Sequence, residues 1–393
     1  MHSGIRKRFG ELFLVMVLTA LVAGVAHFVI TNPLGLSRIW YQVQAPFIQL
    51  QTRCSKAVPQ WLQAVQGYAT RNMGAPASQL AWITPGGQLH HCETGWKDGI
   101  FGEQPIQPNN RFRFASVTKT PVAIIVLDLI NEGELALDAK VIDILGLKGT
   151  LKDKRVGEIT VGHLLSHRAG WDRTRSQDPM FMMSIKPWCP GSPEKLTSMH
   201  LMYNPGETES YSNLGYCLLG LVVEQVTGKS IREYASEYFD FANNTLSFVD
   251  GPFKQDEPKY DFRHENFYME DYYRKFDFQA ISSSAGLSGS ASDLGLLVKN
   301  ALDSRPLNIL AGDMNGDCDP SKIQNCYGFG VYRYQPEGEK PLYIHGGKLP
   351  GATSAIIITP DKGVLVWLGA GVPPPGSNAH QEFYDVIRES ISG

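Results

Sequence analysis

The sequence lacks the features that mark several large classes of protein. Its 36 lysine and arginine residues and 39 aspartate and glutamate residues give a formal net charge of -3, so it has no basic surplus of the kind that nucleic-acid-binding proteins show. It has no low-complexity tract and no repeat with a period of about 20–50 residues, which argues against a solenoid or propeller. Hydrophobic residues make up 43% of the chain, enough for a globular protein with one large domain or two ordinary ones.

Cysteine is scarce as well, with six residues in the chain. No two of them form a Cys-x-x-Cys pair, so we expect no structural zinc site. Cys318 and Cys326 bracket a short polar loop that a disulfide could close, and Cys54 and Cys92 are a second candidate pair. Cys217 lies in an apolar run, and we expect it to be a buried free thiol. Disulfides persist in oxidising compartments, so the candidate pairs agree with export.

One long apolar run is present, and it lies near the N-terminus. It covers residues 12–30 without a charge and follows Arg6, Lys7 and Arg8. At about 1.5 Å per residue, it is roughly as long as the hydrocarbon core of a bilayer is thick, and the basic flank should stay on the cytoplasmic side. The alternative is a cleaved signal peptide, whose apolar region is usually shorter; residues 24–26 could serve as its small-x-small site.

These features divide the chain into three expected parts. Residues 1–31 would be a transmembrane anchor or signal peptide, residues 32–54 a juxtamembrane connector, and residues 55–393 a folded domain. We favour the anchor, which would hold the folded domain outside the cytoplasm, in the periplasm if the source is bacterial. The membrane is therefore one expected partner, and the oligomeric state stays open.

Local patterns predict strands at both ends of the folded domain and helices between them. Apolar periodicity predicts helices and alternating runs joined by tight turns predict hairpins. The predicted helices are residues 57–71, Thr118–Glu132, Val161–His167, Leu214–Thr227 and His380–Ser392, and the predicted strands are Gln79–Thr84, Gln88–Thr94, Ala352–Thr359 and Val364–Leu368. The pattern is not a parallel βαβ alternation. It favours a sheet built from the two ends of the domain, with a helical insertion at roughly residues 118–280.

Ser116 and Lys119 form a Ser-x-x-Lys motif at the start of a strongly periodic apolar segment. Residues three apart share a helix face, which places a hydroxyl beside an amine. Desolvation and the positive end of the helix dipole both lower the pKa of a lysine, so that a neutral amine can take the serine proton. The motif occurs again at Ser192 and Lys195, but no apolar helix follows, and we interpret that copy as coincidence. Alone, Ser116 could equally be a helix N-cap.

Two further short motifs carry polar groups that could serve the same site. Tyr211 and Asn213, spaced Tyr-x-Asn, offer a phenol that can relay protons and an amide that can hold a substrate carbonyl and the lysine together. Alone, this motif is typical of a loop that caps a helix. His345, Gly346 and Gly347 end a strand-like run, and glycines let a substrate lie close along an edge strand. Alone, this motif is a Gly-rich turn.

In this order, Ser-x-x-Lys, Tyr-x-Asn and His-x-Gly resemble the three active-site motifs of the serine β-lactamase superfamily, in the branch that holds class C β-lactamases, D-alanyl-D-alanine carboxypeptidases, D-aminopeptidases and related esterases. The resemblance runs from residue 57 to the C-terminus and includes the flanking segments 129–138, 159–167, 284–287 and 291–294. It implies an α/β fold of the α+β type, in which an antiparallel β-sheet is flanked by helices and carries a helical subdomain. The active site would lie between them, and no cofactor is expected.

The implied activity is that of a serine hydrolase. Ser116 would be acylated, Lys119 would deprotonate it, and Tyr211 would be the general base or proton relay. The backbone N–H groups of Ser116 and Lys348 would form the oxyanion hole. The substrate would be an amide, peptide, ester or β-lactam, and a D-amino-acid peptide or small ester is favoured.

The substrate-binding residues implied by the resemblance are Asn213, His345, Gly346, Gly347 and Lys348. Class C β-lactamases have a lysine where His345 stands, which supplies a permanent charge for a carboxylate. A histidine supplies that charge only when protonated, near an unperturbed pKa of about 6.5. This departure puts β-lactam hydrolysis in doubt. We expect His345 to favour anionic substrates as the pH falls toward about 6.

Two other patterns favour structural roles. His163 and His167 are four residues apart on a predicted helix, as metal ligands can be, but no glutamate follows His163 as in zinc-protease helices, and we expect no metal. The aromatic stretch Tyr260–Phe278 could wall a substrate cleft, but we favour packing of an inserted segment on the core. The alternative to a hydrolase is a non-hydrolytic penicillin-binding or scaffold relative, although the three reactive side chains are all present.

Overall fold

The computed structural model describes residues 2–182, 184–265, 269–312 and 318–392, with side chains from residue 10 to residue 391 of these ranges. The chain forms two compact units, Met1–Phe47 and Ile48–Gly393. The basic side chains of Arg6, Lys7 and Arg8 lie outside the described residues.

The first unit is dominated by one long helix. α1 (His2–Thr31) contains the stretch Gly10–Thr31, which is the one helix in the described part of the chain that is long and apolar enough to cross a membrane. By length and composition it fits either a membrane anchor or a signal sequence. α2 (Gly35–Gln49) follows, so the expected connector is partly helical.

Within the described residues, the second unit is built around a seven-stranded sheet in the order β1-β3-β2-β10-β9-β8-β7, and every neighbouring pair is antiparallel. The strands are β1 (Arg53–Cys54), β2 (Ser78–Ile83), β3 (Leu89–Thr94), β7 (Tyr332–Tyr334), β8 (Leu342–Leu349), β9 (Ala352–Ile358) and β10 (Val364–Gly369). The two ends of the domain join where β2 pairs with β10, from Ile83 opposite Val364 to Ser78 opposite Gly369. The prediction of a sheet built from both ends is confirmed.

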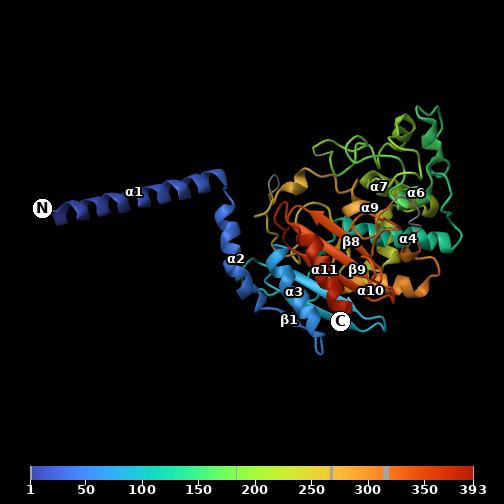
Figure 1. The fold of residues 1–393 in the computed structure, drawn as a ribbon. Helices are drawn as coiled ribbons and strands as arrows, with labels where there is room; N and C mark the ends of the chain where they lie inside the picture. The colour runs from blue at the N-terminus through green and yellow to red at the C-terminus, as the bar shows by residue number, and fades with distance from the viewer. Residues whose placement is uncertain (1, 183, 266–268, 313–317, 393) are drawn as a thin grey trace. The chain divides into compact units, whose positions relative to one another are not determined.

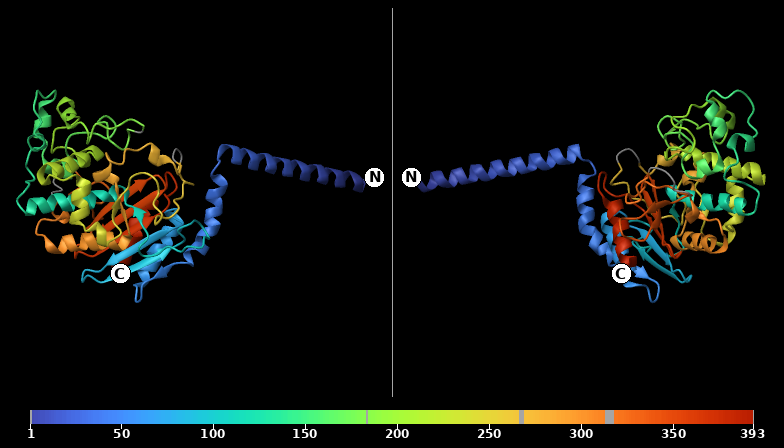
Figure 2. Two further views of the ribbon diagram at one scale, coloured as in Figure 1. Left: turned by 180° about the vertical axis from the view of Figure 1, so that it is seen from behind. Right: turned by 45° about the vertical axis from the view of Figure 1, so that its right-hand side comes forward.

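Most helices lie between the two halves of the sheet in sequence. The α-helices of this unit are α3 (Gln60–Asn72), α4 (Lys119–Asn131), α5 (Val141–Ile144), α6 (Val161–Leu165), α7 (Asn213–Thr227), α8 (Ile231–Tyr238), α9 (Ser282–Ala285), α10 (Ala291–Ser304) and α11 (Ala379–Ser392). The 3-10 helices are η1 (Ala115–Thr118), η2 (Lys154–Glu158), η3 (Pro193–Ser198), η4 (Phe241–Asn243), η5 (Tyr272–Arg274) and η6 (Ile309–Ala311). A small antiparallel sheet pairs β6 (Leu287–Gly289) with β4 (Phe112–Arg113) and β5 (Ser247–Phe248). In both views of Figure 2 the green and yellow segments gather to one side of the large sheet.

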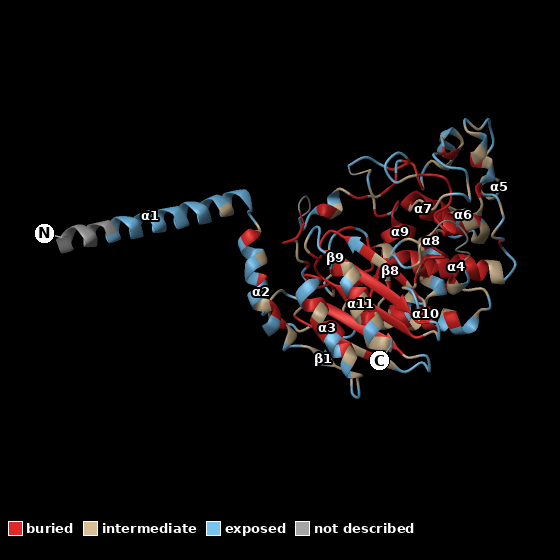
Figure 3. Cartoon of the chain, in the orientation of Figure 1, coloured by how far each residue is buried: buried red, intermediate tan, exposed pale blue. Residues whose placement is uncertain are grey.

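Helices cover both faces of the large sheet. α3 and α11 pack together on one face (Figure 1), and α10 packs against β2 and β10 on the other. The alternation of side chains along a strand explains this division. Trp367 of β10 contacts Phe383 of α11, whereas its neighbour Val366 faces Gly295 of α10. The strands and α4 are largely buried (Figure 3). The predicted fold class, an antiparallel sheet flanked by helices with a helical insertion, is confirmed.

Disulfides join three pairs of cysteines in the described chain: Cys54–Cys92, Cys189–Cys217 and Cys318–Cys326. The first and last are the pairs expected from the sequence. The prediction of a free thiol at Cys217 is wrong. Its apolar surroundings indicated burial correctly, but Cys189 reaches it from 28 residues away, a contact that no local pattern reveals.

The aromatic stretch packs inward around a buried charge. Tyr260 and Tyr272 are buried and lie about the guanidinium of Arg113, which pairs with Glu257 at 2.9 Å. These side chains line the protein interior, as the packing interpretation expects. Residues 266–268 of the same stretch lie outside the described residues.

Candidate active site

Ser116 lies in η1, where the chain leaves the small sheet and enters α4. The residue before it, Ala115, has a φ of 48°, a left-handed conformation that residues other than glycine rarely adopt and that is concentrated at functional sites. Two contacts hold this turn. The backbone N–H of Phe114 donates to the carbonyl oxygen of Leu287 at 2.9 Å, and the hydroxyl of Ser354 donates to the carbonyl oxygen of Phe114 at 2.5 Å. Ser116 itself remains partly exposed.

Lys119 is fully buried one helical turn beyond Ser116. Its Nζ lies 2.8 Å from Asn213 Oδ1, 2.8 Å from the carbonyl oxygen of Ser284 and 3.4 Å from Ser116 Oγ. Burial lowers the pKa of this amine well below its ordinary value, and the nearby carboxylate of Asp178 opposes that effect only in part. The amine is therefore biased toward its neutral form.

When protonated, Lys119 can donate to all three of these groups. In the neutral form that burial favours, the amine has two N–H donors and one lone pair for the same three contacts. Asn213 Oδ1 and the carbonyl oxygen of Ser284 can only accept, so they take the two N–H donors. The lone pair is left for the hydroxyl of Ser116, which can donate. This geometry suits transfer of the serine proton to the lysine.

Asn213 is oriented by a buried carboxylate that sequence reasoning missed. Asp178 is fully buried and accepts from the backbone N–H of Asn213 at 2.8 Å and from its Nδ2 at 3.0 Å. It also accepts from the backbone N–H of Met180 at 3.0 Å. Because Nδ2 faces the carboxylate, Oδ1 faces Lys119. Asn213 thus contacts the lysine directly, as expected of an amide at this position.

Tyr211 stands over the serine and the lysine. Its hydroxyl forms a hydrogen bond with Ser116, and its ring centre lies 4.7 Å from Lys119 Nζ. The ring of His167 packs on it with the two centres 4.3 Å apart. Burial raises the pKa of the phenol above its ordinary value, and the hydrogen bond with Ser116 lowers it in part. The phenol is therefore neutral at physiological pH and touches the serine, as a proton relay requires.

Strand β8 passes the serine with its side chains on alternate faces. Gly347 is on the serine side, where an added Cβ would lie 2.5 Å from the carbonyl oxygen of Phe114 and 3.0 Å from Ser116 N. Only glycine allows this approach. Gly346 and Lys348 face α11 instead. These two expected substrate-binding residues therefore direct no side chain to the serine, and any part that they play rests on their backbone.

His345 is on the serine side of β8 but is fully buried. Its Nδ1 lies 2.8 Å from the carbonyl oxygen of Gly346, so Nδ1 carries the proton and donates it, which leaves a lone pair on Nε2. Burial lowers the pKa of His345 to about 3, and Lys119 acts in the same direction whenever its amine is protonated. The expectation that this residue becomes an imidazolium as the pH falls toward about 6 is wrong, because it assumed the pKa of an exposed histidine.

Comparison with known proteins agrees with this geometry. The Beta-lactamase family model matches residues 69–383. The chain belongs to the Beta-lactamase family. A protein named as fimbrial assembly protein FimD (serogroup D) of Dichelobacter nodosus is 37% identical over 361 residues, which are 91% of this chain and 90% of that protein. Esterase EstB of Burkholderia gladioli is 34% identical over 141 residues, 33% of this chain and 35% of the esterase.

The fold of this Beta-lactamase family member also matches solved structures. The D-amino acid amidase of Ochrobactrum anthropi SV3 superposes with a TM-score of 0.67 at 20% identity, over 84% of this chain and 98% of the amidase. At that identity the likeness concerns the fold alone. The family resemblance inferred from the three motifs is confirmed by the family model, and an esterase is among the relatives of the chain.

The two histidines that were expected on one helix are used by the protein's own backbone, and His167 lies beyond the end of α6 at Leu165, with a φ of 57°. His163 Nδ1 accepts from the backbone N–H of Thr160 at 3.2 Å and so caps α6. His167 Nδ1 accepts from the backbone N–H of Ser212 at 3.3 Å, and the ring packs beside Tyr211. Within the described ranges, no group of three or more histidine, cysteine, aspartate or glutamate side chains could hold a metal ion.

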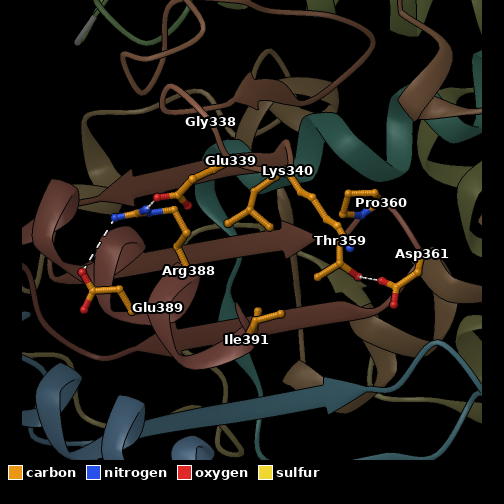
Figure 4. Close-up of a pocket in the computed structure, with 10 residues that line it drawn as sticks. Gly338, Glu339, Lys340, Thr359, Pro360, Asp361, Arg388, Glu389 and Ile391 are labelled. Atoms are coloured by element: carbon orange, nitrogen blue, oxygen red, sulfur yellow. Dashed lines mark hydrogen bonds and ion pairs between the residues drawn. The ribbon is translucent and has the colours of Figure 1, made fainter. Parts of the chain in front are cut away.

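Two other places in this Beta-lactamase family member lie apart from Ser116. The second Ser-x-x-Lys copy falls at the start of η3, where Lys195 is exposed and lacks the burial that Lys119 has. A pocket of about 520 Å³ lies beside β8, β9 and α11 (Figure 4). Arg388 pairs there with Glu339 and Glu389, and none of the predicted site residues lines the pocket.

Proposed function

We propose that this protein is a serine hydrolase that forms an acyl-enzyme on Ser116, with an amide, peptide, ester or β-lactam as substrate and a D-amino-acid peptide or small ester as the favoured class. The observation that carries the proposal is the environment of Lys119. Burial biases the amine toward its neutral form, in which two carbonyl oxygens take its N–H donors and its lone pair can face Ser116 Oγ, 3.4 Å away. A nucleophile in contact with a neutral base is the arrangement that covalent catalysis requires.

In the acylation step, Ser116 Oγ would bond to the substrate carbonyl carbon while its proton passes to Lys119. The backbone N–H groups of Ser116 and Lys348 would hold the negative charge that develops on the carbonyl oxygen. The close approach of Gly347 to Ser116 N supports this pairing of segments. Tyr211, which contacts Ser116, would give its proton to the leaving group, so that the C–N or C–O bond breaks and a neutral amine or alcohol departs. Lys119 would then pass the serine proton on to Tyr211, which returns both side chains to their neutral forms.

In the deacylation step, water would add to the acyl carbon and give a proton to Ser116 Oγ through Tyr211, so that the bond between the acyl carbon and Oγ breaks and the carboxylic acid departs. The open edge of β8 suggests where the substrate lies. Among the described residues, β7 pairs with the first three residues of β8, Leu342–Ile344. Residues 345–349 of β8 therefore have no described strand partner on that side. An extended substrate could add its own backbone to this edge.

We further propose that residues 1–31 anchor the protein, residues 32–54 connect, and residues 55–393 act outside the cytoplasm. The apolar helix Gly10–Thr31 and the three disulfides of the described chain support this arrangement. After alkaline extraction of membranes the protein should stay in the pellet, and it should be cleaved by protease added to spheroplasts. Release into the periplasmic fraction would instead indicate a cleaved signal.

The function is tested with the full-length protein in detergent. Nitrocefin, D-Ala-D-Ala peptides, D-aminoacyl anilides and short p-nitrophenyl esters are assayed with the wild type and with Ser116→Ala in parallel. We expect the wild type to turn over at least one of these classes and Ser116→Ala to turn over none. Equal turnover by both proteins would overturn the proposal.

A second candidate function is a role in fimbrial assembly, which the 37% identity with the Dichelobacter nodosus protein over 91% of this chain favours. In this alternative the fold would serve as a non-hydrolytic scaffold. To test this, the gene for this protein is deleted in its source organism, and the strain is complemented with the wild type or with Ser116→Ala. Fimbriae are then counted by electron microscopy. Fimbriae restored by both proteins would indicate a scaffold, whereas fimbriae restored by the wild type alone would tie assembly to hydrolysis.

A further inference from the structure

A fixed positive charge lies next to the Tyr211 ring. Arg173 belongs to an exposed loop after α6. Its guanidinium carbon lies 4.9 Å from the centre of the Tyr211 ring and 5.0 Å from the centre of the Phe181 ring. Two cation–π contacts therefore orient the group. The Tyr211 hydroxyl forms a hydrogen bond with Ser116, so the side chain of Tyr211 alone separates the guanidinium from the nucleophile.

Among the described residues, Arg173 forms neither an ion pair nor a hydrogen bond, and its contacts are those with the two rings. Its N–H donors are therefore available to a ligand. The acidic residues nearest to it in sequence have other partners. Asp172 pairs with Arg175, and Asp178 accepts from Asn213. A planar guanidinium with free donors and full charge matches the geometry of a carboxylate.

The other basic groups around the serine are poor sources of that charge. Burial lowers the pKa of Lys119, of His345 and of His167. The side chain of Lys348 faces α11. In the described residues, the serine-facing side of β8 thus carries no permanent cation, and Arg173 brings one to the site from the loop after α6.

We propose that Arg173 is a specificity-determining residue that binds a carboxylate of the substrate, so that the site selects acyl compounds with a free carboxylate close to the scissile bond. This assignment rests on the serine hydrolase function proposed above. Phe181, which is 53% exposed beside the guanidinium, would contact the apolar part of such a substrate.

The test uses matched boronic acids, because boron bonds reversibly to a nucleophilic serine. The probes are 3- and 4-carboxyphenylboronic acid and the two corresponding carboxamides, which have nearly the same shape without the charge. Binding to the full-length protein is measured by calorimetry, and hydrolysis of p-nitrophenyl acetate is measured in parallel. We expect the wild type to bind at least one carboxylate about 10- to 100-fold more tightly than its carboxamide.

The pH dependence separates arginine from histidine as the source of the charge. The preference for the carboxylate should be the same at about pH 6 and about pH 8, because a guanidinium stays charged throughout, whereas an exposed histidine titrates in this range. A preference that disappears between these two pH values would overturn the assignment to Arg173.

Two arginine variants provide the comparison. Arg173→Gln should abolish the preference, and Arg173→Lys should keep part of it. Arg175→Gln is the matched control. It removes an arginine two residues from Arg173 that already pairs with Asp172, so this variant should keep the preference of the wild type.

The outcomes distinguish this inference from the proposed function. A preference that survives in Arg173→Gln, that is lost equally in Arg175→Gln, or that is absent from a wild type which still binds the carboxamides, overturns the role of Arg173 and leaves the hydrolase proposal standing. Failure of every boronic acid to bind, together with no ester hydrolysis, overturns the hydrolase proposal and this inference with it.

Discussion

Replacement of Asp178 with asparagine is expected to disable the site without altering any residue of the three motifs. The carboxylate accepts from the backbone N–H of Asn213 at 2.8 Å, from its Nδ2 at 3.0 Å, and from the backbone N–H of Met180 at 3.0 Å. An amide at this position has one oxygen instead of two and turns an NH₂ group toward at least one of these donors. The simplest relief is a flip of the Asn213 amide. That flip would present Nδ2 to Lys119 and draw the lysine lone pair away from Ser116.

The expected losses of stability and of activity can both be worked out from these contacts. Hydrogen bonds to charged groups contribute about 1.5–3 kcal/mol each, and a buried donor without a partner costs about 1–3 kcal/mol. With one of three donors unsatisfied, the free energy of unfolding of Asp178→Asn should fall by about 2–4 kcal/mol. A positioned acid–base group contributes about 10²–10⁴-fold to the rate, so kcat/KM should fall by about 10²-fold or more.

The assay is kcat/KM for a p-nitrophenyl ester across a pH range, below the unfolding temperature of the variant. Asp178 is the carboxylate that raises the pKa of Lys119 against the effect of burial. Its removal leaves the amine neutral, so a higher pH should not restore the activity of Asp178→Asn. Activity close to that of the wild type, or recovery of the variant at alkaline pH, would refute the positioning role.

An exchange of the two side chains serves as the control. Asp178→Asn combined with Asn213→Asp restores a hydrogen bond between the two positions, so stability should partly return. A carboxylate then lies next to Lys119 and raises the pKa of the amine, which becomes protonated. The activity of this double variant should therefore rise with pH as the amine loses its proton, in contrast to the single variant.

The remaining predictions concern the relay, the close approach of β8 and the unexpected disulfide. Tyr211→Phe keeps the ring and removes the hydroxyl, so turnover should fall by about 10²–10⁴-fold at an unchanged melting temperature; a loss of less than about threefold would remove the phenol from the mechanism. Gly347→Ala forces a Cβ to 2.5 Å from the carbonyl oxygen of Phe114; it should cost about 1–3 kcal/mol in urea denaturation and lower kcat/KM, and wild-type kinetics would contradict the geometry. Replacement of both Cys189 and Cys217 by serine opens a loop of 28 residues; we expect a loss of about 3–4 kcal/mol in oxidising buffer, and equal stability with the wild type would argue against this pairing.

Elements that depend on neighbours in sequence were predictable. The strands of the β2–β3 and β9–β10 hairpins agree with the predicted strands to within one residue at each end. Side-chain alternation and Pro-Gly or Asp-Lys-Gly turns are local signals, so one sequence suffices to read them. The helix predicted from Thr118 begins instead as η1 at Ala115, because contacts with the small sheet and with Ser354 shape that turn.

The proximity of the candidate site residues was predictable for a different reason. Ser116 and Lys119 meet because a helix places residues three apart on one face. Tyr211 and Asn213 adjoin them through a fold that the resemblance implied. Their contacts with Ser116 and Lys119 in the structure agree with that placement.

What the sequence did not reveal depends on distant contacts. Asp178 is a single aspartate in a loop, 35 residues from Asn213, and nothing in its surroundings marks it. Likewise, no local pattern links Cys189 to Cys217, which lies 28 residues further along the chain. The low pKa of His345 follows from its burial between the rings of Tyr327 and Tyr332, 5.7 and 5.9 Å away. Burial of this kind is set by the packing of β7 and β8.

The measurement that tests the central claim most directly is acylation of Ser116 by a fluorophosphonate, followed by intact mass and peptide mapping. The wild type should gain one probe on Ser116. Lys119→Met, which keeps the length of the side chain but has no base, should react at least about 10²-fold more slowly. Label on Ser192, no label on the wild type, or labelling of Lys119→Met at the wild-type rate would contradict the assignment of Ser116 as nucleophile and Lys119 as its base.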